Sequence, residues 1–502
     1  MGKLDELRQR NEAALAGGGE QSIQAQHSAG KQTARERLNS LLDPGSFVEI
    51  DKFLQRTYVT PGFEAVSATG EGVVCGYGTI EERPVYVFAQ DYTVLMGSFS
   101  AAHASKILKV MDMAVKSGVP VIGVMDSGGA RVSEGIAAID GTAQVLKKLS
   151  DISGVIPTIS VIAGPCIGTV AYLAALTDFT FMVDGISSLA LYGPQIYASA
   201  MQKEIDVNVA LGARTHNEVS GISQFLCADE AQCFVNVKKL LSFLPSNNLD
   251  DAPYEMTADD LNRQLPFGDV PVAAKDLILS VADNSDILEY QALYAPEVIT
   301  AFGRINGNAC GFIANSEAAA LTKQAAAKAA RFISILDAFN IPAITFTNCG
   351  NTPVGEALEQ TGMPEGFAGL INAYAQATIP KLNVIIGKAV GDGFAVMCPK
   401  ALGADMVYAW PTAEISALPI EAGALIMYEK EIAEADDGIA AKQQMIKRYA
   451  EENANPWQAA EQGVVDEVIE PAHTRQVLIA SLEMSLSKRE EKLPKKHSVL
   501  PL

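Results

Sequence analysis

The sequence predicts an α/β protein built from two tandem copies of one domain. The first observation is an internal duplication, because several blocks recur along the 502 residues at offsets of 222 to 225. The second is the alternation of short Val- and Ile-rich runs, bounded by Gly and Pro, with segments whose apolar residues recur at helical spacing. The offset far exceeds the roughly 20 to 50 residues of a solenoid repeat, so it indicates duplicated domains.

Each duplicated block reads as a buried strand that ends in small or polar residues. Residues 117–131 (SGVPVIGVMDSGGAR) are matched by residues 339–353 (FNIPAITFTNCGNTP), at an offset of 222. Residues 154–164 (GVIPTISVIAG) are matched by residues 377–387 (ATIPKLNVIIG), at an offset of 223. Because the offset stays nearly constant from block to block, the two halves are expected to share one topology.

Helical segments separate the strands in both halves. Residues 102–117 and 323–339 carry apolar side chains at i, i+3 and i+4, which predicts helices that cover the sheets. The first 45 residues predict a polar helical arm. We expect an N-terminal domain over residues 1–245, a connector over 246–295, where Asn, Asp and Pro cluster, and a C-terminal domain over 296–502.

Composition excludes several classes of function. The chain has 38 basic against 59 acidic residues, a net charge of −21, which argues against a nucleic-acid partner. Seven scattered cysteines without a Cys-x-x-Cys pair fit reduced thiols in a cytoplasmic protein, and five histidines without a His-x-x-x-His pair predict no metal site. The polar N-terminus and the short apolar runs predict neither a signal peptide nor a membrane helix.

The first candidate site follows the strand that runs to Gly164. Small residues after it open a helix, so backbone N–H groups are expected at a helix N-terminus, where the macrodipole favours negative charge. Gly168 lets a ligand approach the main chain closely. This arrangement predicts an oxyanion hole for a thioester enolate, and tight packing between strand and helix is the alternative explanation of the glycines.

The duplicated position in the second half is residues 386–397 (IGKAVGDGFAVM). Gly391, Asp392 and Gly393 stand where a second oxyanion hole is expected by the same geometry. Two equivalent junctions favour the functional explanation more than one would.

The segment Asp126-Ser-Gly-Gly-Ala-Arg131 follows another buried strand. Gly128 and Gly129 could form a backbone nest for an acyl or carboxyl oxygen, with Arg131 as an anion clamp, or the segment is only a turn. A serine nucleophile is disfavoured because Gly-x-Ser-x-Gly is absent, and Cys166 reads as a small core residue. The sequence has no phosphate-binding or dinucleotide-binding glycine motif, and no Ala-Met-Lys-Met biotin attachment site.

These blocks resemble the biotin-dependent carboxyltransferase family over nearly the whole chain. This family contains the β subunits of propionyl-CoA carboxylase, the transcarboxylase core and the α subunits of methylmalonyl-CoA decarboxylase. The resemblance rests on GKQTARERL at 30–38, LDPGSFVE at 42–49, DSGGAR at 126–131, GPC at 164–166, LGAD at 402–405 and AWPTAEI at 409–415.

The resemblance implies two tandem crotonase-like (ClpP/crotonase) domains per chain and a homo-hexamer. The N-terminal domain would bind the coenzyme A thioester through Gly128, Gly129, Arg131, Gly164 and Ile167. The C-terminal domain would receive biotin from a separate biotin carboxyl carrier protein. Further partners would be a biotin carboxylase or membrane decarboxylase subunits, which could hold this chain at the cytoplasmic membrane face. No metal is implied.

Two oxyanion holes would carry the catalysis in this family. The thioester hole maps to Gly168 and Thr169, and the biotin hole to Gly391, Asp392 and Gly393. Both depart from the family pattern, because Thr169 replaces one glycine, and Gly391-Asp392-Gly393 stands where the family has Gly-Gly-Ala. A carboxylate at such a site opposes the negative charge to be stabilised, unless its side chain points away.

The leading hypothesis is therefore a carboxyltransferase subunit that moves a carboxyl group between biotin and a short acyl-CoA, most plausibly propionyl-CoA or methylmalonyl-CoA. The sequence leaves the direction of the reaction and the acyl chain length open. One alternative is a biotin-independent crotonase-like acyl-CoA enzyme. Another is a non-catalytic assembly subunit of a carboxylase or decarboxylase complex.

Overall fold

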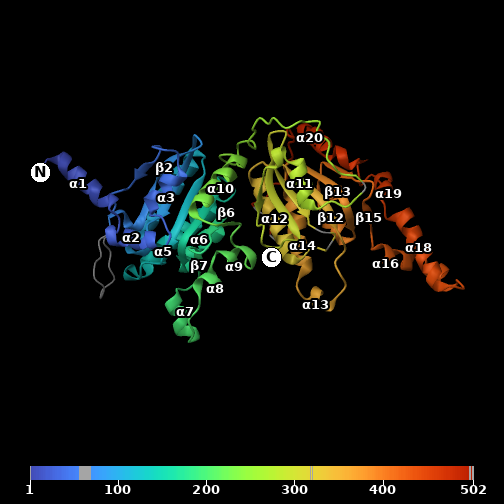
Figure 1. Ribbon diagram of the computed structural model, residues 1–502, viewed down its shortest axis with the longest axis horizontal. Coiled ribbons are helices and arrows are strands. Elements are labelled where there is room, and N and C mark those ends of the chain that lie inside the picture. The colour runs from blue at the N-terminus through green and yellow to red at the C-terminus, as the bar shows by residue number, and fades with distance from the viewer. Residues whose placement is uncertain are drawn as a thin grey trace. The chain divides into compact units, whose positions relative to one another are not determined.

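The computed structural model describes residues 2–55, 69–268, 270–316, 318, 320–496 and 499. It divides the chain into two compact units, Met1–Asp250 and Asp251–Leu502. Within the described residues each unit holds one eight-stranded mixed sheet with helices packed on it (Figure 1), so the predicted α/β class is confirmed.

The sheet of unit 1 has the order β1-β2-β3-β4-β5-β6-β8, with β7 paired to the end of β5. The first three strands pair antiparallel, and β3 to β8 pair parallel. The strands are β1 (Val48–Ile50), β2 (Val73–Ile80), β3 (Arg83–Gln90), β4 (Val121–Ser127), β5 (Thr158–Ile167), β6 (Phe179–Val183), β7 (Ser188–Ala190) and β8 (Phe225–Cys227).

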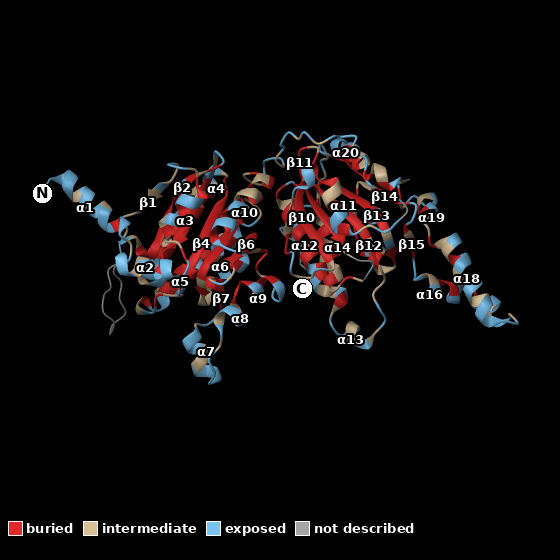
Figure 2. Ribbon diagram, in the orientation of Figure 1, coloured by how far each residue is buried: buried red, intermediate tan, exposed pale blue. Residues whose placement is uncertain are grey.

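The helices of unit 1 bury the sheet from both sides. Apolar residues of α4, α5 and α6 form one core with β2, β3 and β5, whereas α3 and α10 contact each other and the strands β3 and β6. The helices are α1 (Lys3–Leu15), α2 (Glu20–Ser28), α3 (Ala34–Leu41), α4 (Ala101–Ser117), α5 (Ile136–Ile152), α6 (Ala171–Leu176), α7 (Pro194–Met201), α8 (Val207–Leu211), α9 (Ala213–Glu218) and α10 (Glu230–Phe243). Figure 2 shows the buried strands between the more exposed helices.

The sheet of unit 2 repeats this topology in the order β16-β14-β13-β12-β11-β10-β9, with β15 paired to the end of β13. Again the strands β9 to β11 pair antiparallel and the remainder pair parallel. The strands are β9 (Ile287–Tyr290), β10 (Val298–Ile305), β11 (Asn308–Asn315), β12 (Ala343–Cys349), β13 (Lys381–Val390), β14 (Met406–Ala409), β15 (Glu414–Ser416) and β16 (Glu467–Val468).

Helices also cover the sheet of unit 2, where α11 and α20 share a core with β10 to β14, and α12 contacts α14. The helices are α11 (Ala274–Val281), α12 (Lys323–Ala338), α13 (Glu356–Glu359), α14 (Met363–Gln376), α15 (Asp392–Val396), α16 (Ile420–Met427), α17 (Glu429–Ala433), α18 (Gly438–Asn453), α19 (Pro456–Glu461) and α20 (Thr474–Ser485). Residues 246–295, for which we predicted a connector, thus carry α11 and β9.

The two long predicted helices begin at equivalent caps. The Ser100 hydroxyl accepts a hydrogen bond from the His103 N–H at 2.9 Å at the start of α4. The Thr322 hydroxyl accepts from the Ala325 N–H at 3.1 Å at the start of α12, 222 residues later. Such caps satisfy N–H groups that have no acceptor inside the helix.

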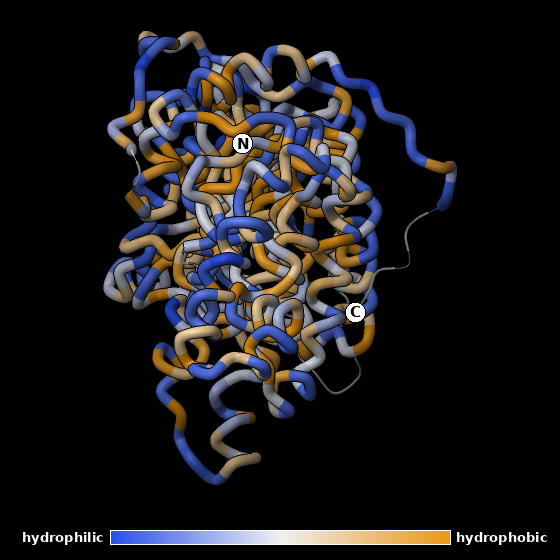
Figure 3. Tube along the Cα trace, turned by 90° about the vertical axis from the view of Figure 1, so that its right-hand side faces the viewer, coloured by the Kyte–Doolittle hydropathy of each residue, from blue (hydrophilic) through white to orange (hydrophobic). Residues whose placement is uncertain are grey.

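Burial follows the hydropathy of the sequence. Figure 3 shows hydrophobic residues concentrated in the interior of the trace and hydrophilic residues along its outer turns. All seven cysteines are buried free thiols. Among the described residues, no helix combines the length and the apolar character needed to cross a membrane.

Candidate active site

The two predicted junctions are equivalent in backbone geometry. The strands β5 (Thr158–Ile167) and β13 (Lys381–Val390) begin and end at an offset of 223. Each is followed at once by a glycine with positive φ, +74° at Gly168 and +57° at Gly391. Side chains other than glycine are strained at such angles, so both glycines are needed for the chain to leave the strand in this way.

The first junction offers open hydrogen-bond donors. Gly168, Thr169 and Val170 form a single 3-10 turn (η4) that leads into α6. The Gly168 and Thr169 N–H groups lie at the start of this turn. The buried hydroxyl oxygen of Thr169 has no hydrogen-bond partner among the described residues. Because α6 is only six residues long, these individual donors matter more than the predicted macrodipole.

The turn after β4 packs directly against this junction. A Cβ on Gly129, where φ is +102°, would lie 3.1 Å from the Ile167 carbonyl oxygen. Three N–H groups of the turn donate within the protein: Gly128 to the Met96 O at 2.8 Å, Gly129 to the Ser127 Oγ at 3.2 Å and Arg131 to the Phe99 O at 2.8 Å. The Ala130 N–H, which the sequence analysis did not single out, has no acceptor among the described residues.

A buried charge network holds the start of this turn. The Asp126 carboxylate is fully buried, and it accepts hydrogen bonds from Gln26 at 2.8 Å, Lys31 at 3.0 Å and Arg37 at 2.8 Å. Gly164 is required beside it, because a Cβ there would lie 2.1 Å from the Asp126 Oδ1. Burial lowers the pKa of the Lys31 ammonium, and the Asp126 carboxylate opposes that change.

Arg131 holds the other end of the turn. Its guanidinium is buried and donates to Glu71 at 2.5 Å and to Glu134 at 3.4 Å. Its charge is thus neutralised by two buried carboxylates of the same unit. In this structure Arg131 anchors the turn to its surroundings.

Cys166 lies within β5, two residues before Gly168. Burial raises the pKa of its thiol to about 12, so the thiolate is not populated at neutral pH. This agrees with its predicted role as a core residue.

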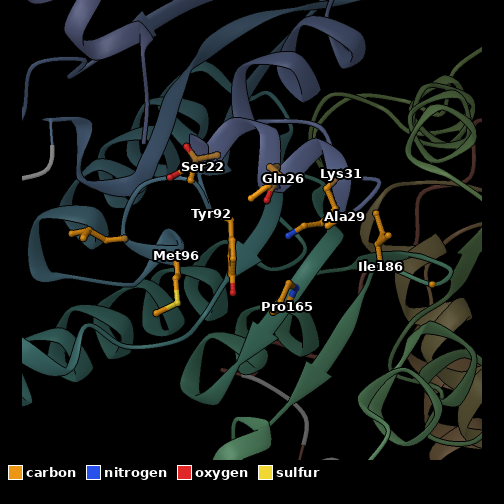
Figure 4. A pocket seen from close by; sticks show the side chains of 12 residues that line it. Ser22, Gln26, Ala29, Lys31, Tyr92, Met96, Pro165 and Ile186 are labelled. Atoms are coloured by element: carbon orange, nitrogen blue, oxygen red, sulfur yellow. The ribbon is translucent and has the colours of Figure 1, made fainter. Parts of the chain in front are cut away.

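A cavity of about 600 Å³ reaches β5 at Pro165, three residues before Gly168 (Figure 4). Pro165 of β5 lines this cavity. Met96, whose carbonyl oxygen accepts a hydrogen bond from the Gly128 N–H, lines it too. The lining residues are Ser22, Ala25, Gln26, Ala29, Lys31, Tyr92, Thr93, Leu95, Met96, Pro165, Gly185 and Ile186. Figure 4 shows Tyr92 between Met96 and Lys31, and the Lys31 Nζ lies 4.3 Å from the centre of the Tyr92 ring.

The second junction has the same backbone but different hydrogen bonding. The Gly391 N–H donates to the Ser416 O at 3.0 Å. The Asp392 carboxylate accepts from the Thr352 N–H at 3.0 Å, from the Thr352 hydroxyl and from the Gly393 N–H at 3.0 Å. Thr352, which the sequence analysis missed, lies 222 residues after Ala130, which it also missed, so the repeat offset identifies Thr352 only once the role of Ala130 is known.

Two cavities flank α15 in unit 2. One of about 400 Å³ is lined by Thr352, Leu358, Glu359, Met363, Pro364, Phe367, Ala368, Ile371, Asp392, Ala395 and Val396. The other, of about 350 Å³, is lined by Gly391, Phe394, Ile415, Ser416, Ala417, Tyr449, Asn453, Gln458, Ala459, Gln462 and Val464. Both lie within the size range of small-molecule sites.

Comparison with known proteins assigns the family. The profile described as carboxyl transferase domain matches residues 25–500. The chain belongs to the carboxyl transferase family. The predicted family resemblance is therefore confirmed over nearly the full length.

Relatives of this family match the chain from end to end. It is 42% identical to the methylmalonyl-CoA decarboxylase subunit alpha of Propionigenium modestum, over 100% of this chain and 99% of the relative. It is 41% identical to the propionyl-CoA carboxylase beta chain of Saccharopolyspora erythraea, over 100% of this chain and 96% of the relative.

A solved structure extends the comparison to the fold. The transcarboxylase 12S structure, a hexamer with methylmalonyl-coenzyme A and methylmalonic acid bound, is 38% identical. It superposes with a TM-score of 0.95 over 100% of this chain and 98% of the other. The predicted pair of tandem crotonase-like domains is confirmed.

Proposed function

We propose that this chain is the carboxyltransferase subunit of a multi-subunit biotin-dependent enzyme acting on propionyl-CoA and methylmalonyl-CoA. The observation that carries the proposal is the junction of Gly168, Thr169 and Ala130, where the Ala130 N–H and the Thr169 hydroxyl have no partner among the described residues. A cavity of about 600 Å³ reaches the same strand at Pro165. Full-length similarity to subunits named for these substrates supports the acyl class. It favours neither a biotin-independent enzyme nor a non-catalytic assembly subunit.

The open donors suit the oxygen of a thioester enolate. When the carbon–carbon bond to the carboxylate of methylmalonyl-CoA breaks, CO2 leaves and the electron pair moves into the thioester carbonyl. The enolate oxygen can accept from the Gly168, Thr169 and Ala130 N–H groups, whose fixed positions stabilise its charge without reorganisation. Carboxylation passes through the same enolate, formed by loss of the α-proton of propionyl-CoA, for which the biotin left after release of CO2 would supply the base. The same donors therefore serve both directions.

The remaining predicted residues of unit 1 shape the acyl-CoA site. Gly129, Gly164 and Ile167 bring the turn and the strand end close together, since a Cβ on Gly129 would approach the Ile167 O and one on Gly164 would overlap Asp126. Gly128 packs against Met96 instead. Arg131, with Glu71 and Glu134, is a positioning residue for the turn in this proposal.

Biotin, attached to a separate carrier protein in this proposal, carries the carboxyl group to or from the site. As they stand, the residues of the second junction do not fit a biotin carbonyl oxygen. The Thr352 and Gly393 N–H groups already donate to Asp392. No step of the reaction is therefore assigned to Gly391, Asp392 or Gly393.

The proposed assembly follows the relatives. A hexamer of the kind named for transcarboxylase 12S is proposed here too, together with a biotin carboxyl carrier protein. A biotin carboxylase partner would favour carboxylation, and membrane decarboxylase subunits would favour decarboxylation. A cytoplasmic location stays a prediction.

Turnover of defined thioesters tests this proposal. Purified protein with methylmalonyl-CoA and free biotin should yield propionyl-CoA by mass spectrometry, faster than without biotin and faster than with malonyl-CoA or glutaconyl-CoA. Equal rates with and without biotin would contradict biotin dependence.

A matched pair of glycine variants tests the site. Gly168→Ala and Gly45→Ala each place a side chain at a φ near +75° with no atom closer than 4.0 Å, so their strain is similar. Gly168→Ala should lower turnover about 100-fold by displacing the donors, whereas Gly45→Ala should leave turnover unchanged. Equal turnover in the two variants would reject the site.

A further inference from the structure

The Asp392 carboxylate lies in a cradle of neutral donors. It accepts from the Thr352 N–H at 3.0 and 3.2 Å, from the Thr352 hydroxyl, and from the Gly393 N–H at 3.0 Å. Every hydrogen-bond partner that the structure gives this carboxylate is uncharged. Several N–H and O–H donors that converge on one group form an anion-binding site, and here the anion is the chain's own side chain.

The internal duplication identifies what this cradle is. Thr352 is the counterpart of Ala130 at an offset of 222, and Asp392 is the counterpart of Thr169 at an offset of 223. In unit 1 the Ala130 N–H has no acceptor and the Thr169 hydroxyl has no partner among the described residues. In unit 2 the Thr352 N–H has one only because Asp392 supplies it. The backbone N–H at this position is therefore without an acceptor in unit 1 and bound by Asp392 in unit 2.

The filled cradle opens on a cavity. Thr352 and Asp392 both line the mostly apolar cavity of about 400 Å³, so a ligand there would meet the carboxylate where unit 1 offers open donors. A carbonyl oxygen and a carboxylate oxygen cannot share one set of donors, and their negative charges repel. A ligand that needs these donors must displace the side chain.

We propose that Asp392 is an internal competitor for the anion cradle of unit 2, and that a ligand's carbonyl oxygen binds there only after this side chain turns out. The inference rests on the proposed function for the identity of the ligand, the ureido carbonyl of biotin. Affinity is then reduced by the fraction of molecules in which the cradle is open. Asp392 thereby determines how tightly this subunit holds its carboxyl donor.

The test compares ligand binding by wild-type protein and Asp392→Ala, measured by titration calorimetry without any acyl-CoA. With the cradle vacated, Asp392→Ala should bind free biotin about 10- to 100-fold more tightly than wild type. Asp392→Asn, which keeps the size but loses the charge, should lie between them. Asp276→Ala removes an exposed acidic residue from the first turn of another unit 2 helix, and it should bind biotin as wild type does.

Formate provides a readout that does not depend on biotin. In Asp392→Ala, formate should enter the empty cradle, raise the melting temperature and weaken biotin binding competitively, and it should do neither in wild type. Equal biotin affinity in wild type and variant, with no effect of formate, would overturn the proposal. Formate binding without biotin binding would uphold the internal competitor and overturn biotin as the ligand of unit 2.

Discussion

The two strand–helix junctions share one backbone and differ in what their donors hold. At Gly168 and Gly391 the chain leaves equivalent strands, and φ is positive at both glycines. One residue later stands Thr169, whose hydroxyl has no partner among the described residues, and in the other unit Asp392, whose carboxylate has three donor groups. Two side-chain differences, Thr169 against Asp392 and Ala130 against Thr352, thus separate an open anion site from a filled one.

The two units also share a buried lysine contact that lies outside the candidate sites. Lys106 and Lys328 are related by the offset of 222, and each is a buried lysine whose ammonium donates to backbone carbonyls at or before the start of the first long strand. Lys106 donates to the Gly70 O at 2.9 Å and to the Val73 O at 2.5 Å; Lys328 donates to the Gln291 O at 2.8 Å and to the Tyr294 O at 2.9 Å. This buried lysine contact is present in both units, whereas the residues at the two strand–helix junctions differ.

The largest expected effect concerns the support under each turn. Asp126→Ala would leave the buried Lys31 without its carboxylate partner and Arg37 with Glu230 alone, so we expect a loss of about 3 to 5 kcal/mol in the free energy of unfolding. Its counterpart Asn348, 222 residues later, is neutral and accepts from the Lys388 N–H at 2.9 Å. Asn348→Ala should therefore cost only about 1 to 2 kcal/mol. Calorimetric unfolding would check both, and equal losses would contradict the asymmetry.

The sequence predicted the repeat more completely than the site. Helices expected at 102–117 and 323–339 are observed at Ala101–Ser117 and Lys323–Ala338, because local periodicity determines them. The hydrogen bonds of Asp392 were not predictable, since its partner Thr352 lies 40 residues away and only the fold brings them together. The burial of Lys31 against Asp126, 95 residues apart, escaped prediction for the same reason.

The second prediction places an aspartate in unit 1 at the position equivalent to Asp392. In Thr169→Asp a carboxylate would stand at the open donors, as Asp392 does in unit 2, and would oppose the enolate charge. We expect turnover of methylmalonyl-CoA to fall about 100- to 1,000-fold, with binding of the CoA ester retained. Steady-state kinetics together with titration calorimetry would measure both. Thr169→Asn, equal in size and uncharged, is the control, and an equal loss there would mean that size and not charge is responsible.

The third prediction uses the buried lysine of unit 2. Burial lowers the pKa of Lys328 to about 8 from 10.5, so between these values the unfolded chain binds the proton more tightly. Stability from this group therefore rises as the pH increases from about 8 to 10.5, by at most about 3 kcal/mol. The difference in melting temperature, wild type minus Lys328→Met, should increase between pH 7.5 and pH 10. A constant difference between the two proteins would refute the shift.

The smallest expected effect isolates the Thr169 hydroxyl. Thr169→Val keeps the shape of the side chain and removes a buried hydroxyl that has no protein partner in the described chain, so folding stability should be unchanged or slightly higher. If the hydroxyl donates to the enolate, kcat should fall about 10-fold while the KM for methylmalonyl-CoA stays constant.

Thr142→Val provides the inverse control within the same unit. The Thr142 hydroxyl is buried and donates to the Ala138 O at 2.9 Å, so its loss should lower the free energy of unfolding by about 1 kcal/mol and leave kcat unchanged. Thr169→Val should thus lower kcat and not stability, and Thr142→Val should lower stability and not kcat. A Thr169→Val enzyme with wild-type kcat would mean that the N–H groups of Gly168, Thr169 and Ala130 suffice, and that the open junction of unit 1 owes its activity to backbone alone.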